Sequence, residues 1–333
     1  MDWLGSIVMI AAAVLLLMGL QMGGVEYPWS SPIIVTCISF GTVLGGLFVI
    51  VEWKFAKYPL MPLRTFRSRN SLGSLGVACF HSMTVIGASY FLPLYFQGAL
   101  RASPLMSGVF LLPFTLSLSI TSAVTGFVVR GTGRYLMAMR VSTLLMALGL
   151  GLFIDLPSYY NWTKLIIYQL LVGFGVGPNF QCPLIALQAT IPQADHAAAS
   201  STFNFFRNLS ASVAIVASTS IFQNSMQSQH DALVVRLGSK VAGLLTGNNA
   251  ASNVEVIDGL PDPERDFAQK LFLKGMLGMW IMYVIFGFGA FACSLWVKNT
   301  VLSKEHKATE TGLKAEEAKR TLEENRRKSL RER

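Results

Sequence analysis

Long apolar segments without charged residues constrain this chain more than any other feature. Residues 71–100 and 165–194 contain no Asp, Glu, Lys or Arg, so neither can form an amphipathic helix of a soluble protein. About 20 mainly apolar residues in a helix cross a hydrocarbon core of about 30 Å. The sequence therefore predicts an all-α polytopic membrane protein with about eight transmembrane helices, over residues 4–21, 32–52, 72–97, 104–129, 136–156, 164–191, 200–223 and 274–297.

Composition agrees with a membrane protein and argues against a soluble enzyme. Hydrophobic residues make up 52% of the 333 residues and charged residues only 14%, whereas soluble domains have about 25% charged residues. The net charge of +9 does not indicate nucleic-acid binding, because 11 of the 27 Lys and Arg residues follow Val297. Segment 4–21 is interpreted as a span and not as a secretory signal peptide, since Asp2 precedes it and its apolar run is long.

The distribution of basic residues predicts the orientation, because cytoplasmic loops carry an excess of Lys and Arg. If the eight helices alternate, loop 53–70, turn 130–140 and the C-terminal tail share one side with nineteen basic residues, and the other side has seven. Both termini are therefore predicted to be cytoplasmic. Loop 224–273 is predicted to lie outside and to be partly flexible, with one amphipathic helix over 232–245.

The chain shows no pattern of catalytic or metal-binding residues. Its four cysteines lie inside apolar runs and are interpreted as small apolar fillers: Cys37, Cys79, Cys182 and Cys293. Its four histidines are scattered over a helix, two loops and the tail, so no metal or other cofactor is expected: His81, His196, His230 and His306. A membrane-embedded enzyme, such as an acyltransferase, would need His, Asp or Glu clustered at one membrane face, and this alternative ranks below a transporter.

A basic, glycine-rich turn and several short segments resemble a known transporter family. The turn reads GFVVRGTGRY and contains Gly126, Arg130, Gly133 and Arg134. It resembles the degenerate second copy of the cytoplasmic motif loop of the major facilitator superfamily. It departs from that motif at two positions, with Arg130 in place of the Asp and Gly131 in place of the first Arg. Further segments occur in the order found in fungal drug:proton antiporters of the fourteen-helix branch: GLQMGGVEYPWSSP, PLMPLRTFRSRN, ASPLMSGVFLLPF, GVGPNFQCPLIALQ and FFRNLSASVAIV.

The resemblance implies a plan of the chain. Residues 1–53 are similar to an inserted pair of transmembrane helices, 54–70 to a cytoplasmic basic loop, and 71–298 to the C-terminal six-helix bundle. Residues 299–333 form a charged cytoplasmic tail. The family's first six helices have no counterpart here, so the chain is expected to supply one wall of a cavity. The missing N-terminal half or a second copy would be needed to complete that cavity.

The resemblance also implies a function. The family members are multi-pass transporters that export small amphipathic drugs or toxins in exchange for protons, and the plasma membrane is the expected location. The partners expected for this chain are the lipid bilayer, the organic cargo and protons, with no nucleic acid. The alternative is a non-transporting remnant or truncated gene product that only associates with membrane proteins.

Polar side chains inside the spans are candidates for the substrate cavity, because such residues are costly in lipid. Arg207 lies about two turns into the seventh span beside Asn204, and its alternative role is a snorkelling anchor near the interface. His81 lies inside the third span, where it either meets substrate or a proton or supports helix packing. Near the end of that span three side chains suit a cavity or, more simply, an aromatic belt: Tyr90, Tyr95 and Gln97.

The sixth span carries a further candidate. At 100° per residue Gly173, Gly177, Gln181 and Gln188 fall on one stripe. The stripe either packs closely against another helix through its glycines or faces the cavity with its amides. Pro178 has no N–H to donate, so the helix is predicted to bend there, and Gly177 with Pro178 forms a candidate hinge.

Reporter fusions test the predicted topology. Fusions after Arg69, Arg134 and Arg333 are expected to report a cytoplasmic location, because the basic residues concentrate on that side. A fusion near Asn249 is expected to give no cytoplasmic signal. A cytoplasmic signal at Asn249 would contradict the placement of the last two spans.

Overall fold

The computed structural model describes residues 3–23, 27–54, 66 and 68–298. Within these residues the structure is helical and has no β-strand. Six described segments are long and apolar enough to cross a membrane, which confirms the predicted all-α polytopic membrane fold. The two helices before them contain shorter apolar stretches, Ile7–Leu20 and Pro32–Phe48. Most of the predicted basic loop 54–70 and the whole tail 299–333 lie outside the described residues.

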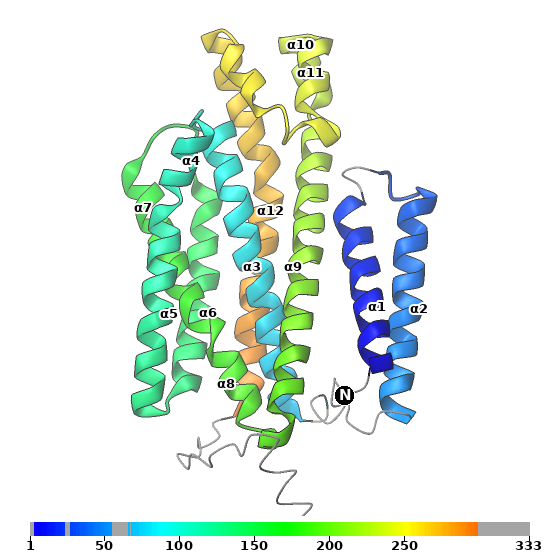
Figure 1. Ribbon diagram of the computed structural model, residues 1–333. Helices are drawn as coiled ribbons and strands as arrows, with labels where there is room; N and C mark the ends of the chain where they lie inside the picture. The colour runs from blue at the N-terminus through cyan, green and yellow to red at the C-terminus, as the bar shows by residue number, and fades with distance from the viewer. Residues whose placement is uncertain (1–2, 24–26, 55–65, 67, 299–333) are drawn as a thin grey trace, which may run out of the picture. The chain divides into compact units, whose positions relative to one another are not determined.

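The first two helices form an antiparallel hairpin (Figure 1). Helix α1 spans Trp3–Met22 and helix α2 spans Pro32–Lys54. Glycine permits their close approach, since a Cβ on Gly41 would lie 2.8 Å from Cγ of Leu16. Small residues at such contacts are typical of helix pairs in membranes, where no hydrophobic force drives helices together.

The six spans that follow form a bundle of long helices (Figure 1). Three of the spans combine consecutive helical elements, whereas the other three are single helices. The bounds are α3 (Arg69–Gly98), α4 (Pro104–Phe110) with α5 (Leu112–Thr132), α6 (Tyr135–Leu152) with η2 (Phe153–Asp155), α7 (Trp162–Val176) with η3 (Gly177–Phe180) and α8 (Cys182–Gln188), α9 (His196–Gln227), and α12 (Asp262–Trp296).

The segment between α9 and α12 is more helical than the sequence predicts. Since α9 continues to Gln227 and α12 begins at Asp262, the predicted loop 224–273 is shortened at both ends. The prediction of one helix over 232–245 is wrong. Gly238, with a φ of 81°, divides this region into two helices, because residues with a side chain rarely adopt that conformation. The short helices are η4 (Gln193–Asp195), α10 (His230–Leu237), α11 (Ser239–Leu245), η5 (Gly247–Asn249) and η6 (Val254–Gly259).

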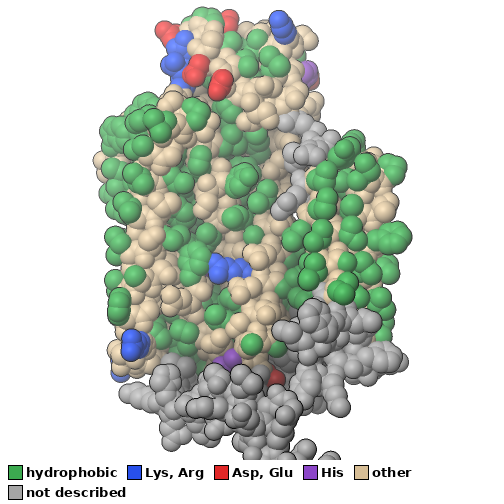
Figure 2. All heavy atoms as spheres, viewed as in Figure 1, with side chains coloured by type: hydrophobic (Ala, Val, Ile, Leu, Met, Phe, Trp, Pro, Cys, Tyr) green, Lys and Arg blue, Asp and Glu red, His purple; other side chains and the backbone are tan. Residues whose placement is uncertain are grey.

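The two ends of the bundle differ in what they carry. The turn at Gly133 between α5 and α6 lies at one end, and α10 and α11 lie at the other (Figure 1). We call them the Gly133 end and the α10–α11 end. Figure 2 shows hydrophobic side chains over the middle of the visible face and acidic side chains gathered at the α10–α11 end. Large apolar side chains such as Phe127 (76% exposed) and Ile285 point outward, as expected where lipid is the solvent.

Aromatic side chains fitted to glycines join α3, α9 and α12. The buried ring of Tyr283 on α12 occupies the space over Gly87 of α3, where any side chain would overlap it. The Tyr283 hydroxyl shares a hydrogen bond with Ser218 of α9. Nearer the α10–α11 end, Phe222 of α9 meets Phe272 of α12 edge to face, with ring centroids 5.1 Å apart. These contacts fix the three helices that carry or support the site described below.

Substitution of Gly87 tests this packing. Gly87→Ala is expected to destabilise the bundle by about 1–3 kcal/mol, because the methyl group overlaps the fully buried ring of Tyr283. Gly151→Ala is the matched control, since no atom lies within 4 Å of a Cβ at that position. Thermal unfolding in detergent, followed by size-exclusion fluorescence, should show a lower midpoint for Gly87→Ala only. Equal midpoints would contradict the packing of Tyr283 on Gly87.

Candidate functional site

The sixth span is interrupted where the sequence predicts a bend. Helix α7 ends at Val176, a turn of 3₁₀-helix follows as η3, and α8 begins at Cys182. Proline lacks the N–H that a continuous α-helix needs, and Pro178 stands in η3. The Nδ2 group of buried Asn179 donates to the carbonyl of Gly175 at 2.9 Å. Hinge motion at Gly177 and Pro178 stays a prediction.

Glycines let this broken helix approach two neighbours. Gly173 and Gly177 pack against α5, and Gly175 packs against α6. A Cβ on Gly177 would lie 2.7 Å from the carbonyl oxygen of Leu118 in α5. The two glycines of the predicted stripe therefore serve close helix packing, which is one of its two predicted roles.

The two amides of the predicted stripe have different neighbours. Gln181 also faces α5, where its Oε1 lies 3.3 Å from the Cβ position of Gly126, and it is exposed. Gln188 instead donates to Oγ of Ser200 in α9 at 3.0 Å. Gly173, Gly177 and Gln181 thus share the face that meets α5, as predicted. Gln188 contacts α9 instead, because the 3₁₀ turn has fewer residues per turn than an α-helix and so shifts which face later residues occupy.

Three helical elements bring His81, Phe180 and Arg207 together. The Nε2 atom of buried His81 lies 3.0 Å from the carbonyl oxygen of Val176. The His81 ring meets the Phe180 ring edge to face at 4.9 Å between centroids. The guanidinium carbon of Arg207 lies 4.5 Å from the centroid of the same Phe180 ring. Ser82 donates to the carbonyl of Arg207 at 2.8 Å and so fixes α9 against α3.

The sequence did not single out Phe180. One Phe among 22 carries no signal of its own, and its partners lie 99 residues before it and 27 after it. Only the phase of η3 turns its ring between the other two side chains. The nearest available signal was the proline two residues earlier, which predicted the break.

Arg207 lies well inside the membrane segment. It follows the first residue of α9 by eleven positions, which is about 16 Å along the helix and three turns, not the two predicted, because α9 begins at His196. Its side chain is partly buried, and the neighbouring Asn204 is exposed. In the described residues no ion pair is formed by Arg207; the pairs are Arg101–Asp258, Lys164–Asp155 and Arg265–Asp262.

The three candidates near the end of α3 do not lie together. Tyr95 is fully buried and its hydroxyl donates to the carbonyl of Pro157 at 2.7 Å. It is a core residue, which differs from both the predicted cavity and the predicted aromatic belt. The Nε2 group of Gln97 donates to Oγ of Ser107 at 3.1 Å. Tyr90 is 63% exposed on the outside of the bundle.

The motif-like turn forms the Gly133 end. Gly133 closes α5 with a φ of 69°, and the side chains of Arg130 and Arg134 are exposed. Arg134 and Arg140 line a shallow cleft of about 320 Å³. Arg140 also donates through Nη2 to the carbonyl of Val297 at 3.0 Å and so ties α6 to the end of α12.

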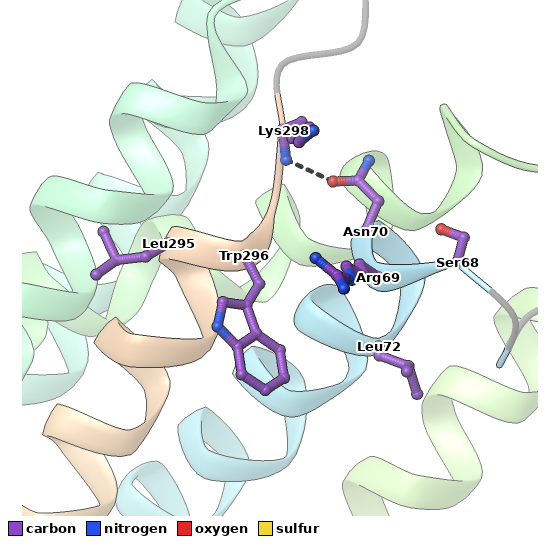
Figure 3. Close-up of a pocket in the computed structure, with 7 residues that line it drawn as sticks. All are labelled: Ser68, Arg69, Asn70, Leu72, Leu295, Trp296 and Lys298. Atoms are coloured by element: carbon purple, nitrogen blue, oxygen red, sulfur yellow. Dashed lines mark hydrogen bonds between the residues drawn. The ribbon is translucent and has the colours of Figure 1, made fainter.

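A larger cleft of about 680 Å³ lies at the same end, between the start of α3 and the end of α12 (Figure 3). Figure 3 shows Arg69 and Trp296 from the two helices beside one another, with the N–H of Lys298 bonded to Asn70. This cleft is a basic surface at the bundle end and is separate from the His81–Phe180–Arg207 cluster. Within the part of the chain that the structure describes, no group of three or more His, Cys, Asp or Glu could hold a metal ion.

Comparison with known proteins adds the family. No protein-family model matches the chain. The chain is 43% identical over 315 residues to efflux pump dotC of Dothistroma septosporum (strain NZE10 / CBS 128990) and 39% identical over 321 residues to MFS-type transporter ppz2 of Metarhizium majus (strain ARSEF 297). It is also 31% identical over 334 residues to an MFS-type transporter of Aspergillus terreus (strain NIH 2624 / FGSC A1156).

These matches cover 95%, 96% and 97% of this chain but only 54%, 55% and 59% of the three relatives. The chain therefore spans about half the length of the curated relatives it matches. Over nearly its whole length the chain is similar to fungal MFS-type transporters and efflux pumps, as the sequence resemblance indicated.

Substitution of Gly177 tests the packing of the broken helix. Gly177→Ala is expected to lower the amount of folded protein, because the methyl group meets backbone atoms of α5 that cannot yield. Gly126→Ala is the control, since the nearest atom to its Cβ is the end of the flexible Gln181 side chain. Fluorescence size-exclusion chromatography measures both. Equal folded yields would contradict the tight contact between η3 and α5.

Proposed function

We propose that this chain is the C-terminal half of a proton-coupled efflux transporter for small amphipathic organic molecules, drugs or toxins. The plasma membrane is its proposed location, with both termini in the cytoplasm. Two relatives are named efflux pumps or MFS-type transporters at 39–43% identity, and the cargo and the coupling ion come from the resemblance. The activity belongs to the proposed complete transporter, in which this chain forms one wall.

One observation carries the proposal for the site. A partly buried cation, Arg207, lies over Phe180 in the break of a membrane helix, and the exposed amide of Gln181 directly follows that break. Asn204 is exposed on α9, three residues before Arg207. Secondary transporters place substrate near the bilayer midplane, between two halves, and beside interrupted helices. We therefore assign the surface around Phe180 to the cavity wall, with His81 behind it as a packing and positioning residue.

The same break suggests how the wall moves. Pro178 removes one backbone hydrogen bond, so the angle between α7 and α8 can change at a lower cost than in an unbroken helix. Gly177, packed against Leu118, is the point about which α8 would turn. We propose that this turn accompanies the opening and closing of the cavity.

Proton coupling requires a titrating group in the transport path. In the described bundle helices and connections the carboxylates stand near the helix ends, as Asp155, Asp195 and Asp262 do. We propose that the coupling carboxylate belongs to the other half of the transporter. The alternative function, a non-transporting remnant, is an outcome of the following test.

The test joins this chain to the part of the Dothistroma pump that its match does not cover and measures efflux. Inverted membrane vesicles with the joined protein should accumulate an amphipathic dye when a pH gradient is imposed, and a protonophore should abolish the accumulation. Absence of accumulation by a folded joined protein would favour the remnant.

In that joined protein Gln181→Leu is expected to change which of several test compounds are exported, because the cavity loses a hydrogen-bonding amide at an exposed position. The amount of folded protein should remain unchanged, since Gln181 is not buried. Gln193→Leu, at an exposed position in η4, is the matched control and should leave the compound profile unchanged. A lower folded yield with an unchanged profile for Gln181→Leu would show that this amide serves packing.

A further inference from the structure

We infer that Arg207 and Phe180 form a recognition site for an anionic group carried on a flat aromatic cargo molecule, with a carboxylate as the simplest such group. The inference rests on the proposed function and adds the chemical class of the cargo. The inference is drawn from three properties of Arg207: its charge, its contact with the Phe180 ring and its position along α9. A residue that only lines a cavity wall needs none of these properties.

The charge of Arg207 lacks a countercharge in the described structure. Its guanidinium is partly buried at a depth of about 16 Å along α9, where an uncompensated cation is costly. The ion pairs of the described residues stand near the α10–α11 end of the bundle and involve other basic residues. An anion that binds beside Arg207 would therefore stabilise the complex, because it supplies the countercharge that this guanidinium lacks in the described structure.

The Phe180 ring determines which anions fit. With the ring 4.5 Å from its carbon, the guanidinium is held against an aromatic surface. Its N–H groups can still donate two parallel hydrogen bonds to a carboxylate. A flat aromatic acid can place its carboxylate on Arg207 and its ring against the exposed part of Phe180, which an aliphatic or neutral compound cannot do.

The site is held in place by contacts behind it. His81 meets Phe180 from the core side and bonds to Val176, while Ser82 bonds to the backbone of Arg207. A preformed site loses less conformational entropy on binding than a flexible one. The exposed amides of Asn204 and Asn208, three residues before and one after Arg207, offer hydrogen bonds to other polar groups of the same cargo.

The chain contains a matched control for this arrangement. The guanidinium carbon of Arg236 in α10 lies 4.8 Å from the centroid of the Phe267 ring. It repeats the contact of Arg207 with Phe180, but at the exposed α10–α11 end of the bundle. A cation there is solvated by water and needs no anionic partner, so its removal should not affect recognition.

The experiment measures binding to this full chain in nanodiscs of neutral phosphatidylcholine. The probes are 1-pyrenebutanoic acid and its methyl ester, which share the flat ring and differ in charge. Arg207→Gln is expected to weaken binding of the acid by about tenfold or more, as the loss of a charged hydrogen-bonded pair implies, and to leave the ester unchanged. Arg207→Lys should fall between, because lysine lacks the planar fork, and Arg236→Gln should match the unmodified chain.

The anionic partner of Arg207 could also be a carboxylate side chain of the other half of the transporter. A second experiment distinguishes that side chain from a carboxylate of the cargo. The binding measurement is repeated with the unmatched part of the Dothistroma pump reconstituted alongside. Retained preference for the acid over the ester supports the cargo site. Loss of that preference, together with weaker copurification of the two parts for Arg207→Gln, would overturn it.

Equal effects of Arg207→Gln on acid and ester, or no effect on either, would also overturn the inference. Since binding is measured without transport, these outcomes leave the proposed function to its own efflux test. If the joined protein exports no dye while this chain still binds the acid more tightly than the ester, the proposed efflux function is wrong. The Arg207–Phe180 recognition site is then retained.

Discussion

The absence of water in the hydrocarbon core is the constraint on which the rest of this structure depends. Every backbone polar group at that depth must be satisfied within the protein, so the spans are helices. Irregular backbone is tolerated only where protein covers it. The 3₁₀ turn η3 meets this condition, because Gly177, Pro178 and Asn179 are all buried and the Asn179 amide bonds to Gly175. The break is thus a supported feature of the bundle and can be placed beside a binding surface.

The same solvent explains why glycines stand at the helix contacts. Lipid tails are as apolar as leucine side chains, so helices associate through close packing and not through exclusion of water. Gly87 accepts the ring of Tyr283, and Gly173, Gly175 and Gly177 let α7 and η3 approach α5 and α6. These contacts place α3, η3 and α9 close enough for His81, Phe180 and Arg207 to meet.

Electrostatics then separates the ends of the bundle from its middle. Charged side chains at the ends pair with one another or reach water, as Lys164 and Asp155 do at 2.5 Å, and Arg140 caps the end of α12. Arg207 departs from this arrangement, since its contact is the Phe180 ring and not a carboxylate. An arginine at that depth is costly, and the proposed use is recognition of an anion that the cargo supplies.

The properties that are local to each segment follow from the order of its residues alone. Hydropathy and length predicted the membrane spans, and the missing N–H of Pro178 predicted the break. The order of short motifs indicated the fungal transporters to which the chain is similar. Sequence reasoning failed where a side chain's role depends on its neighbours: Tyr95 proved to be a core residue, Gln188 turned to α9, and Gly238 split one predicted helix into two. Phe180 is the clearest case, because its partners are distant in sequence and meet it only after η3 changes the helical phase. Periodicity reports which face of a helix a residue occupies, whereas tertiary packing decides which other helix that face meets.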